Sequence, residues 1–85
     1  MFTTYVLYSN TLLKYYTGHC EDLGLRLVQH NSGKNKSTKN GIPWIVIFSK
    51  EADTRGDAIK LEIKIKKRGA KRFLDDQNKL SSAVG

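Results

Sequence analysis

The sequence of 85 residues contains one cysteine, one proline and no apolar run long enough to cross a bilayer. A single thiol, Cys20, cannot form an intramolecular disulfide or a cysteine zinc cluster, which fits a reducing compartment. The longest apolar run, WIVIF at 44–48, is far shorter than the ~20 residues of a membrane helix. The N-terminus shows no basic leader followed by an apolar stretch. We therefore expect a cytoplasmic protein with no membrane partner.

Acidic residues are also scarce, since eight Asp and Glu stand against fifteen Lys and Arg, for a net charge of +7. A chain this basic predicts a polyanionic partner, either nucleic acid or anionic lipid. A basic surface kept only for solubility is the alternative. At 39% apolar residues the chain is still globular, and its length allows one domain. We assign that domain to residues 1–80 and a frayed tail to residues 81–85.

The β-branched and aromatic residues near the N-terminus predict an antiparallel hairpin with strands at 3–9 and 14–19. A helix over 22–32 follows, with acidic residues at its start and Gly33 after its end. Residues 34–42 are polar and lysine-rich, which predicts a loop or a short helix.

The second half of the chain predicts one strand and two helices. Residues 44–49 are apolar without alternation, which indicates a strand buried on both faces, so we expect it at the centre of the sheet. Thr54 and Asp57 form an N-cap pair for a helix over 55–68. A short final helix follows the break at Gly69. The expected fold is therefore α/β (α+β), a small three-stranded, mainly antiparallel sheet flanked by helices in the order β-β-α-(short α)-β-α-α.

One carboxylate has an unusual position on the helix over 55–68. When the helix is projected at about 100° per residue, Glu62 lies in the middle of the apolar arc, opposite the lysines. A buried carboxylate must be paired, protonated or bound to a metal. The pattern allows two interpretations: a structural salt bridge, for instance to Arg26, or a ligand for a hard divalent cation.

Arg26 and His30 are i, i+4 neighbours on the first predicted helix and flank its buried stripe. Arginine binds phosphate oxygens in a bidentate manner, but it can also cover apolar surface with its stem. For His30 the alternative is a histidine at the edge of the core, bonded to a backbone group.

The order of these residues resembles the GIY-YIG endonuclease superfamily, in particular its small single-domain bacterial members. Thr3-Thr4-Tyr5 stands where that family has Gly-Ile-Tyr, and Tyr16-Thr17-Gly18 is a variant of Tyr-Ile-Gly. Further along, EDLGLRLVQHNSGKNKSTKNGIPWIVIFS and DAIKLEIKIKK are similar to the family's central stretch and to the helix that carries its glutamate. The resemblance covers roughly residues 2–75, and the missing Gly-Ile leaves the phenol in place.

This resemblance implies a divalent-metal-dependent endonuclease that hydrolyses phosphodiester bonds in nucleic acid, in DNA rather than RNA, with little sequence specificity. By the same resemblance, Glu62 binds one Mg²⁺ or Mn²⁺ ion and Arg26 clamps the scissile phosphate. The alternative function is a non-catalytic or partner-dependent nucleic-acid-binding module on the same fold, with a protein partner that supplies targeting.

The resemblance also implies roles for two tyrosines and two histidines. Tyr5 acts on the attacking water, as its general base or its orienter, and Tyr16 hydrogen-bonds the phosphate or the nucleophile. His19 stands where relatives often carry Lys and could help with proton transfer. His30 stands where relatives carry His or Tyr. The other two tyrosines of the hairpin are expected to pack in the sheet.

Basic residues would hold the substrate through its phosphates, which sets affinity but carries no sequence information. We therefore expect weak, salt-sensitive binding. The residues expected to bind nucleic acid lie in the polar loop and from the end of the glutamate helix onward, and they are Lys34, Lys36, Lys39, Lys64, Lys66, Lys67, Arg68, Lys71 and Arg72.

Overall fold

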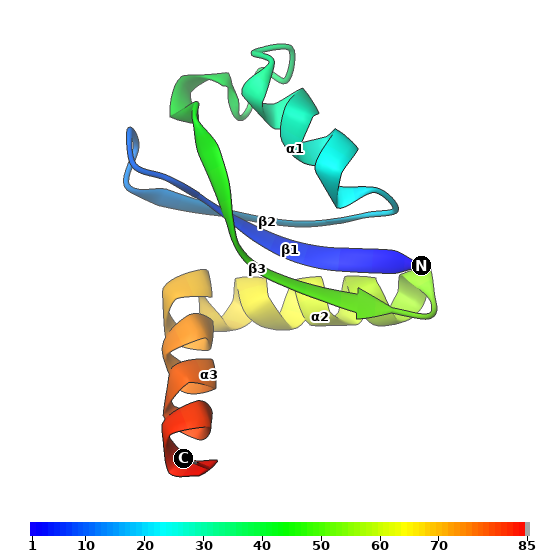
Figure 1. Ribbon diagram of the computed structural model, residues 1–85, viewed down its shortest axis with the longest axis vertical. Coiled ribbons are helices and arrows are strands. Elements are labelled where there is room, and N and C mark those ends of the chain that lie inside the picture. Colours follow the sequence, from blue (N-terminus) through cyan, green and yellow to red (C-terminus); the bar gives the residue numbers. More distant parts are fainter. Residues whose placement is uncertain (85) are drawn as a thin grey trace.

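A computed structural model describes residues 1–84, with a three-stranded antiparallel sheet between helices (Figure 1). The element order confirms the expected α+β fold. None of the described helices is both long and apolar enough to cross a membrane. The elements in chain order are β1 (Phe2–Ser9), β2 (Lys14–Cys20), α1 (Leu23–Asn31), a 3₁₀ turn η1 (Lys39–Gly41), β3 (Trp44–Ala52), α2 (Arg55–Arg68) and α3 (Ala70–Val84).

The strand order is β2-β1-β3, with β1 antiparallel to both neighbours. The expectation that residues 44–49 form the central strand is therefore wrong. That segment begins β3, which lies at an edge of the sheet, and its Ile45 and Ile47 side chains are 46% and 38% exposed. The central strand is β1, whose residues from Thr3 to Leu7 are all buried.

A register shift explains the unbroken apolar run of β3. The pairing of β1 with β3 shifts by one residue between Val6 and Leu7, as at a β-bulge. Before the shift, Trp44 and Val46 pack in the core under α1. After it, Phe48 packs in the second core with α2 and α3. The chain therefore carries apolar residues in succession because the strand changes its buried face.

Successive side chains of β1 contribute alternately to two hydrophobic cores. Tyr5 and Leu7 belong to the core beneath α1, and Val6 belongs to the core with Ile65 of α2 and Phe73 of α3. Figure 1 shows α1 and α2 on opposite sides of the sheet, with α3 running away from the end of α2. Successive residues of β2 therefore point alternately toward α1 and toward α2.

The helix boundaries follow the signals in the sequence. Asp22 is the N-cap of α1, where its Oδ1 accepts a hydrogen bond from Leu25 N at 3.0 Å. Thr54 caps α2 by accepting a hydrogen bond from Asp57 N at 3.1 Å, as predicted. Gly69, at φ 91°, ends α2. The division into a domain at 1–80 and a tail at 81–85 stays a prediction, and Gly85 lies outside the described residues.

Gly18 leaves room for the phenol of Tyr5. The two residues are partners in the register between β1 and β2. A Cβ atom at position 18 would lie 2.7 Å from the hydroxyl oxygen of Tyr5 and 2.9 Å from its Cζ. Both distances are too short for any side chain, so the glycine of the Tyr-Thr-Gly motif is required by the position of the Tyr5 ring.

We expect Gly18→Ala to lower the free energy of unfolding by about 1–3 kcal/mol, because overpacking forces the buried ring to move. The control is Gly24→Ala in the first turn of α1, where the nearest atom to an added Cβ is 3.5 Å away. That change should be neutral or stabilising, by up to about 1 kcal/mol. Urea denaturation measures both. Equal effects of the two substitutions would contradict the close approach at Gly18.

Candidate active site

A buried chain of hydrogen bonds links β1, α1 and the loop before β3. The Tyr5 hydroxyl lies 3.1 Å from His30 Nε2, and His30 Nδ1 lies 3.0 Å from Thr38 Oγ1. Tyr5 is 2% exposed and His30 is 1% exposed. A neutral imidazole has one donor and one acceptor nitrogen, and a hydroxyl can take either role, so both ring nitrogens are satisfied. His30 is thus a core residue bonded to two hydroxyls, and not to a backbone group.

Burial determines the protonation states of Tyr5 and His30, the two titratable members of this hydrogen-bonded chain. Burial raises the pKa of Tyr5, and the charge of Tyr16 raises it further, whereas the Arg26 guanidinium lowers it. Burial also lowers the pKa of His30, and Arg26 lowers it further. Both groups are therefore neutral at neutral pH. A neutral phenol can orient a water molecule, but it cannot accept a proton before it has lost its own.

Tyr16 and Trp44 pack around His30 and its neighbours. The ring of Tyr16 meets that of His30 edge-on, with centroids 4.9 Å apart, and Trp44 lies 6.2 Å beyond Tyr16. Asn31 holds the start of β3, because Trp44 N donates to Asn31 Oδ1 at 2.7 Å and Asn31 Nδ2 donates to Trp44 O at 3.1 Å. The indole Nε1 donates to the carbonyl of Thr38 at 2.7 Å.

Asn31 and Thr38 were not predicted as site residues. Both belong to the stretch that carries the family resemblance, but the resemblance implies no role for either residue. Their partners lie 13 and 8 residues away in the chain, and no local pattern specifies such contacts.

Glu62 lies on the other side of the sheet, where α2 packs against β2. Its Oε1 accepts from His19 Nδ1 at 2.5 Å and its Oε2 accepts from Lys66 Nζ at 2.7 Å. The side chain is 16% exposed. The inward position predicted from the helical projection is therefore observed, but the suggested salt bridge to Arg26 is not. The partners are His19 and Lys66.

Glu62 is ionised in this setting. Burial raises the pKa of its carboxyl group, but the hydrogen bonds from Lys66 and His19 lower it by more, so the pKa lies below its usual range. An ionised carboxylate is the form that binds a hard cation.

The two groups of residues meet at the outer edge of β2. Strand alternation directs Tyr16 toward α1 and His19 toward α2. Because β2 is an edge strand, a molecule lying along it can reach both faces. After burial and the charge of Tyr16, the charge of Arg26 lowers the pKa of Tyr5, and the more weakly acting charge of Glu62 raises it.

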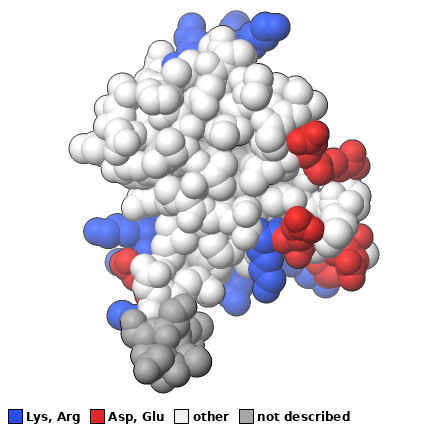
Figure 2. Space-filling view, viewed as in Figure 1, with Lys and Arg blue, Asp and Glu red and all other residues white. Residues whose placement is uncertain are grey.

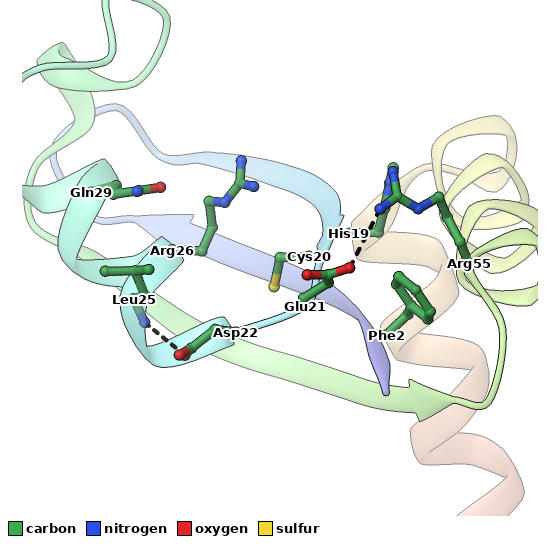
Figure 3. Close-up of a pocket in the computed structure, with 9 residues that line it drawn as sticks. All are labelled: Phe2, His19, Cys20, Glu21, Asp22, Leu25, Arg26, Gln29 and Arg55. Atoms are coloured by element: carbon green, nitrogen blue, oxygen red, sulfur yellow. Dashed lines mark hydrogen bonds and ion pairs between the residues drawn. The ribbon is translucent and has the colours of Figure 1, made fainter.

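A cavity of about 310 Å³ borders this edge on the side of α1 (Figure 3). Its lining includes both Arg26 and His19, so it joins residues from the two groups. Among the side chains that the structure describes, Arg26 makes no ion pair. Its guanidinium is therefore available to a phosphate group. Glu21 at the same cavity is paired with Arg55 at 3.4 Å.

The residues predicted to bind nucleic acid fall into two separate groups. Figure 2 shows Lys and Arg side chains at the top of the molecule and around its lower half, with a wide surface of other residues between them. Two members of the lower group already have partners, since Lys66 binds Glu62 and Arg68 binds Asp76 at 2.9 Å. The upper group is Lys34, Lys36 and Lys39; the lower group is Lys64, Lys66, Lys67, Arg68, Lys71 and Arg72.

The ligands that the protein offers fit a metal ion whose coordination would be completed by substrate and water. Within the described part of the chain, no three His, Cys, Asp or Glu side chains converge on one point. Mg²⁺ is commonly held by one or two carboxylates together with substrate phosphates and water. The ionised carboxylate of Glu62 meets that requirement, but a closed protein site does not exist here. Each oxygen accepts one hydrogen bond and keeps a further lone pair that a cation could use.

The sequence profile of the GIY-YIG catalytic domain matches residues 1–75. The chain belongs to the GIY-YIG family. This is a family of nucleases, and the match confirms the resemblance seen in the sequence. Similar curated proteins include a UPF0213 protein of Staphylococcus saprophyticus and two of Staphylococcus epidermidis, each 36% identical over 52 residues.

Those alignments cover 60% of this GIY-YIG chain and 63% of each relative, so the chain spans less than two thirds of the length of the curated relatives it matches. Their names state no activity. No solved structure matches the chain significantly.

The buried, neutral state of His30 predicts a pH-dependent stability. In the unfolded chain His30 titrates near pH ~6.5, and in the folded protein its pKa is lower. Between these two values only the unfolded state binds the proton, so His30 makes stability fall as pH drops below ~6.5, by at most about 1.4 kcal/mol per pH unit. Urea denaturation of the protein and of His30→Gln measures this. The difference in stability between them should shrink as pH falls, and a constant difference would contradict the assignment.

Proposed function

We propose that this GIY-YIG domain is a divalent-metal-dependent endonuclease that hydrolyses phosphodiester bonds in DNA with little sequence specificity. One observation carries the proposal. An ionised carboxylate, Glu62, lies against His19 at the edge of β2, and Arg26 and Tyr16 approach that edge from the other face of the sheet. A cation site, a fixed positive charge and a phenol at one accessible edge are the groups that phosphodiester hydrolysis needs.

Arg26 contributes the fixed positive charge. Its planar guanidinium can bind two phosphoryl oxygens at once and can stabilise the charge that builds on them during attack. It lies on α1 one turn before His30, whose hydrogen bond to Tyr5 is one of the contacts that join α1 to the sheet.

The two tyrosines have different access to the reaction. Tyr5 is buried, neutral and bonded to His30, which favours an orienting role over that of a general base. Tyr16 is only half-buried, which favours it over Tyr5 as the tyrosine that contacts a phosphate or a water molecule.

Glu62 would hold the metal ion, together with substrate phosphate oxygens and water. When bound, the ion supplies Lewis-acid stabilisation of the leaving oxygen. Before the ion binds, Lys66 and His19 keep the carboxylate ionised and fixed in direction. Both partners donate hydrogen bonds to an ionised carboxylate, so the carboxylate has no proton to lose when a metal ion binds.

Cleavage of labelled single-stranded, duplex, flapped and branched DNA with Mg²⁺ or Mn²⁺ tests the proposal. We expect Glu62→Gln, which keeps the shape of the side chain, to cut at least about 100-fold more slowly. The matched control is Glu51→Gln on β3, an exposed carboxylate whose loss should leave the rate unchanged. If no substrate is cut, or if Glu62→Gln and the parent cut at equal rates, the proposed endonuclease activity is refuted.

A nucleic-acid-binding module without catalysis is the second candidate, and the occupied state of Glu62 favours it. Both carboxylate oxygens are engaged by groups of the chain itself. The same experiment separates the two functions. A pure binding module would retain DNA in a salt-dependent manner, cut nothing with either ion, and bind equally well as Glu62→Gln.

A further inference from the structure

We propose that a groove along the outer edge of β2 binds an unpaired nucleotide, with its base stacked on Tyr15 and its phosphate bound by Lys14 and Lys66. The placement of this subsite beside the cleaved bond rests on the proposed nuclease function. The subsite itself rests on the shape and chemistry of the groove, which are independent of cleavage.

The groove has a volume of about 490 Å³, within the range of ~300–1,000 Å³ typical of small-ligand pockets. Its lining combines two cations, Lys14 and Lys66, with the exposed aromatic residue Tyr15. None of the described residues that line it is a carboxylate. Positive charge beside aromatic surface is the combination that binds single-stranded nucleic acid.

The other cavity at this edge differs in charge. The cavity of about 310 Å³ is lined by the carboxylates Glu21 and Asp22 as well as by Arg26 and Arg55 (Figure 3). Carboxylates repel an anionic strand, and Arg55 is already paired with Glu21. A strand whose phosphate reaches Arg26 therefore continues more favourably over the β2 groove than over this cavity.

Tyr15 offers a ring surface on which a base can stack. It is 38% exposed, and Tyr8, its partner across the two strands, supports the ring with centroids 5.0 Å apart and planes tilted by 54°. An aromatic ring held by a neighbour loses little entropy on binding, because it is already fixed. The contact with Tyr8 confirms the packing role that the sequence predicts for Tyr15, and the residue is also partly exposed.

The ring selects an unpaired base. Inside a duplex both faces of each base are covered by the bases above and below, so a protein ring can stack only on a base that is unpaired or at an end. The proposed ligand is therefore a single-stranded nucleotide, and a continuous duplex should gain nothing from Tyr15.

Lys66 connects the groove to the candidate metal ligand. Its ammonium group binds Glu62 Oε2 at 2.7 Å, and Lys66 is also one of the residues that line the groove. A phosphate bound in the groove competes with Glu62 for that ammonium. Transfer of Lys66 to the phosphate frees one carboxylate oxygen, so occupation of the subsite would prepare Glu62 for a cation.

The test measures binding in EDTA, so that no cleavage occurs, by fluorescence anisotropy of a short single strand and of its duplex. We expect Tyr15→Leu to weaken single-strand binding about 5- to 100-fold and to leave duplex binding within about twofold. Tyr15→Phe, which keeps the ring, should retain the affinity. A 2-aminopurine base in the strand should change its emission on binding to the parent and to Tyr15→Phe, but not to Tyr15→Leu.

Matched controls separate stacking from general effects. Leu25→Ala removes an exposed apolar side chain at the other cavity and should leave binding unchanged. Lys14→Gln should reduce the salt dependence of binding more than Lys60→Gln, which removes the same charge from α2 away from the groove. Circular dichroism and thermal melting establish that each variant is folded.

The subsite is refuted if Tyr15→Leu binds the single strand as tightly as the parent, if it loses equal affinity for duplex, or if the parent does not bind the single strand. Cleavage decides a separate question. A protein that shows the Tyr15 dependence but cuts no DNA would retain the subsite and lose the nuclease function. A protein that cuts DNA without the Tyr15 dependence would retain the function and lose the subsite.

Discussion

The hydrogen-bonded chain from Tyr5 through His30 to Thr38 is the constraint on which the rest of the site depends. It joins the central strand, α1 and the loop before β3 inside the protein, where each polar group must have a partner. Among the described side chains no buried nitrogen or oxygen lacks one. Removal of one member would leave another unsatisfied, at a cost of about 1–3 kcal/mol. Gly18 provides the space for the Tyr5 ring, and the bond from Tyr5 to His30 joins that ring to α1, the helix that carries Arg26.

The alternation of strand side chains divides the candidate site, and the edge position of β2 reunites it. Tyr16 faces α1 while His19 faces α2 and meets Glu62, so the phenols and the carboxylate start on opposite faces. In the middle of the sheet these faces could not serve one ligand. At an edge strand they can, because one ligand along the outer side of β2 could reach both faces.

Local patterns predicted much of this arrangement. The hairpin, the acidic start of α1, the cap at Thr54 and the inward direction of Glu62 all follow from residues close together in the sequence. The partners of Glu62 did not follow, because His19 is 43 residues away and its direction depends on the packing of β2 against α2. The place of β3 was predicted wrongly for a related reason. An apolar run without alternation indicates burial on both faces, but a register shift on an edge strand produces the same pattern.

The proposed chemistry depends on Glu62, whose two carboxylate oxygens accept hydrogen bonds from His19 and Lys66. A crystal structure with Mn²⁺ and a short single strand that carries an uncleavable phosphorothioate linkage tests this most directly, because anomalous scattering locates the ion. We expect an Mn²⁺ peak bonded to the Glu62 carboxylate, with Lys66 Nζ moved away from Oε2. A structure in which Glu62 keeps both of its present hydrogen bonds and the ion binds elsewhere, or in which no ion binds while the strand is present, would contradict the role of Glu62 as the metal ligand.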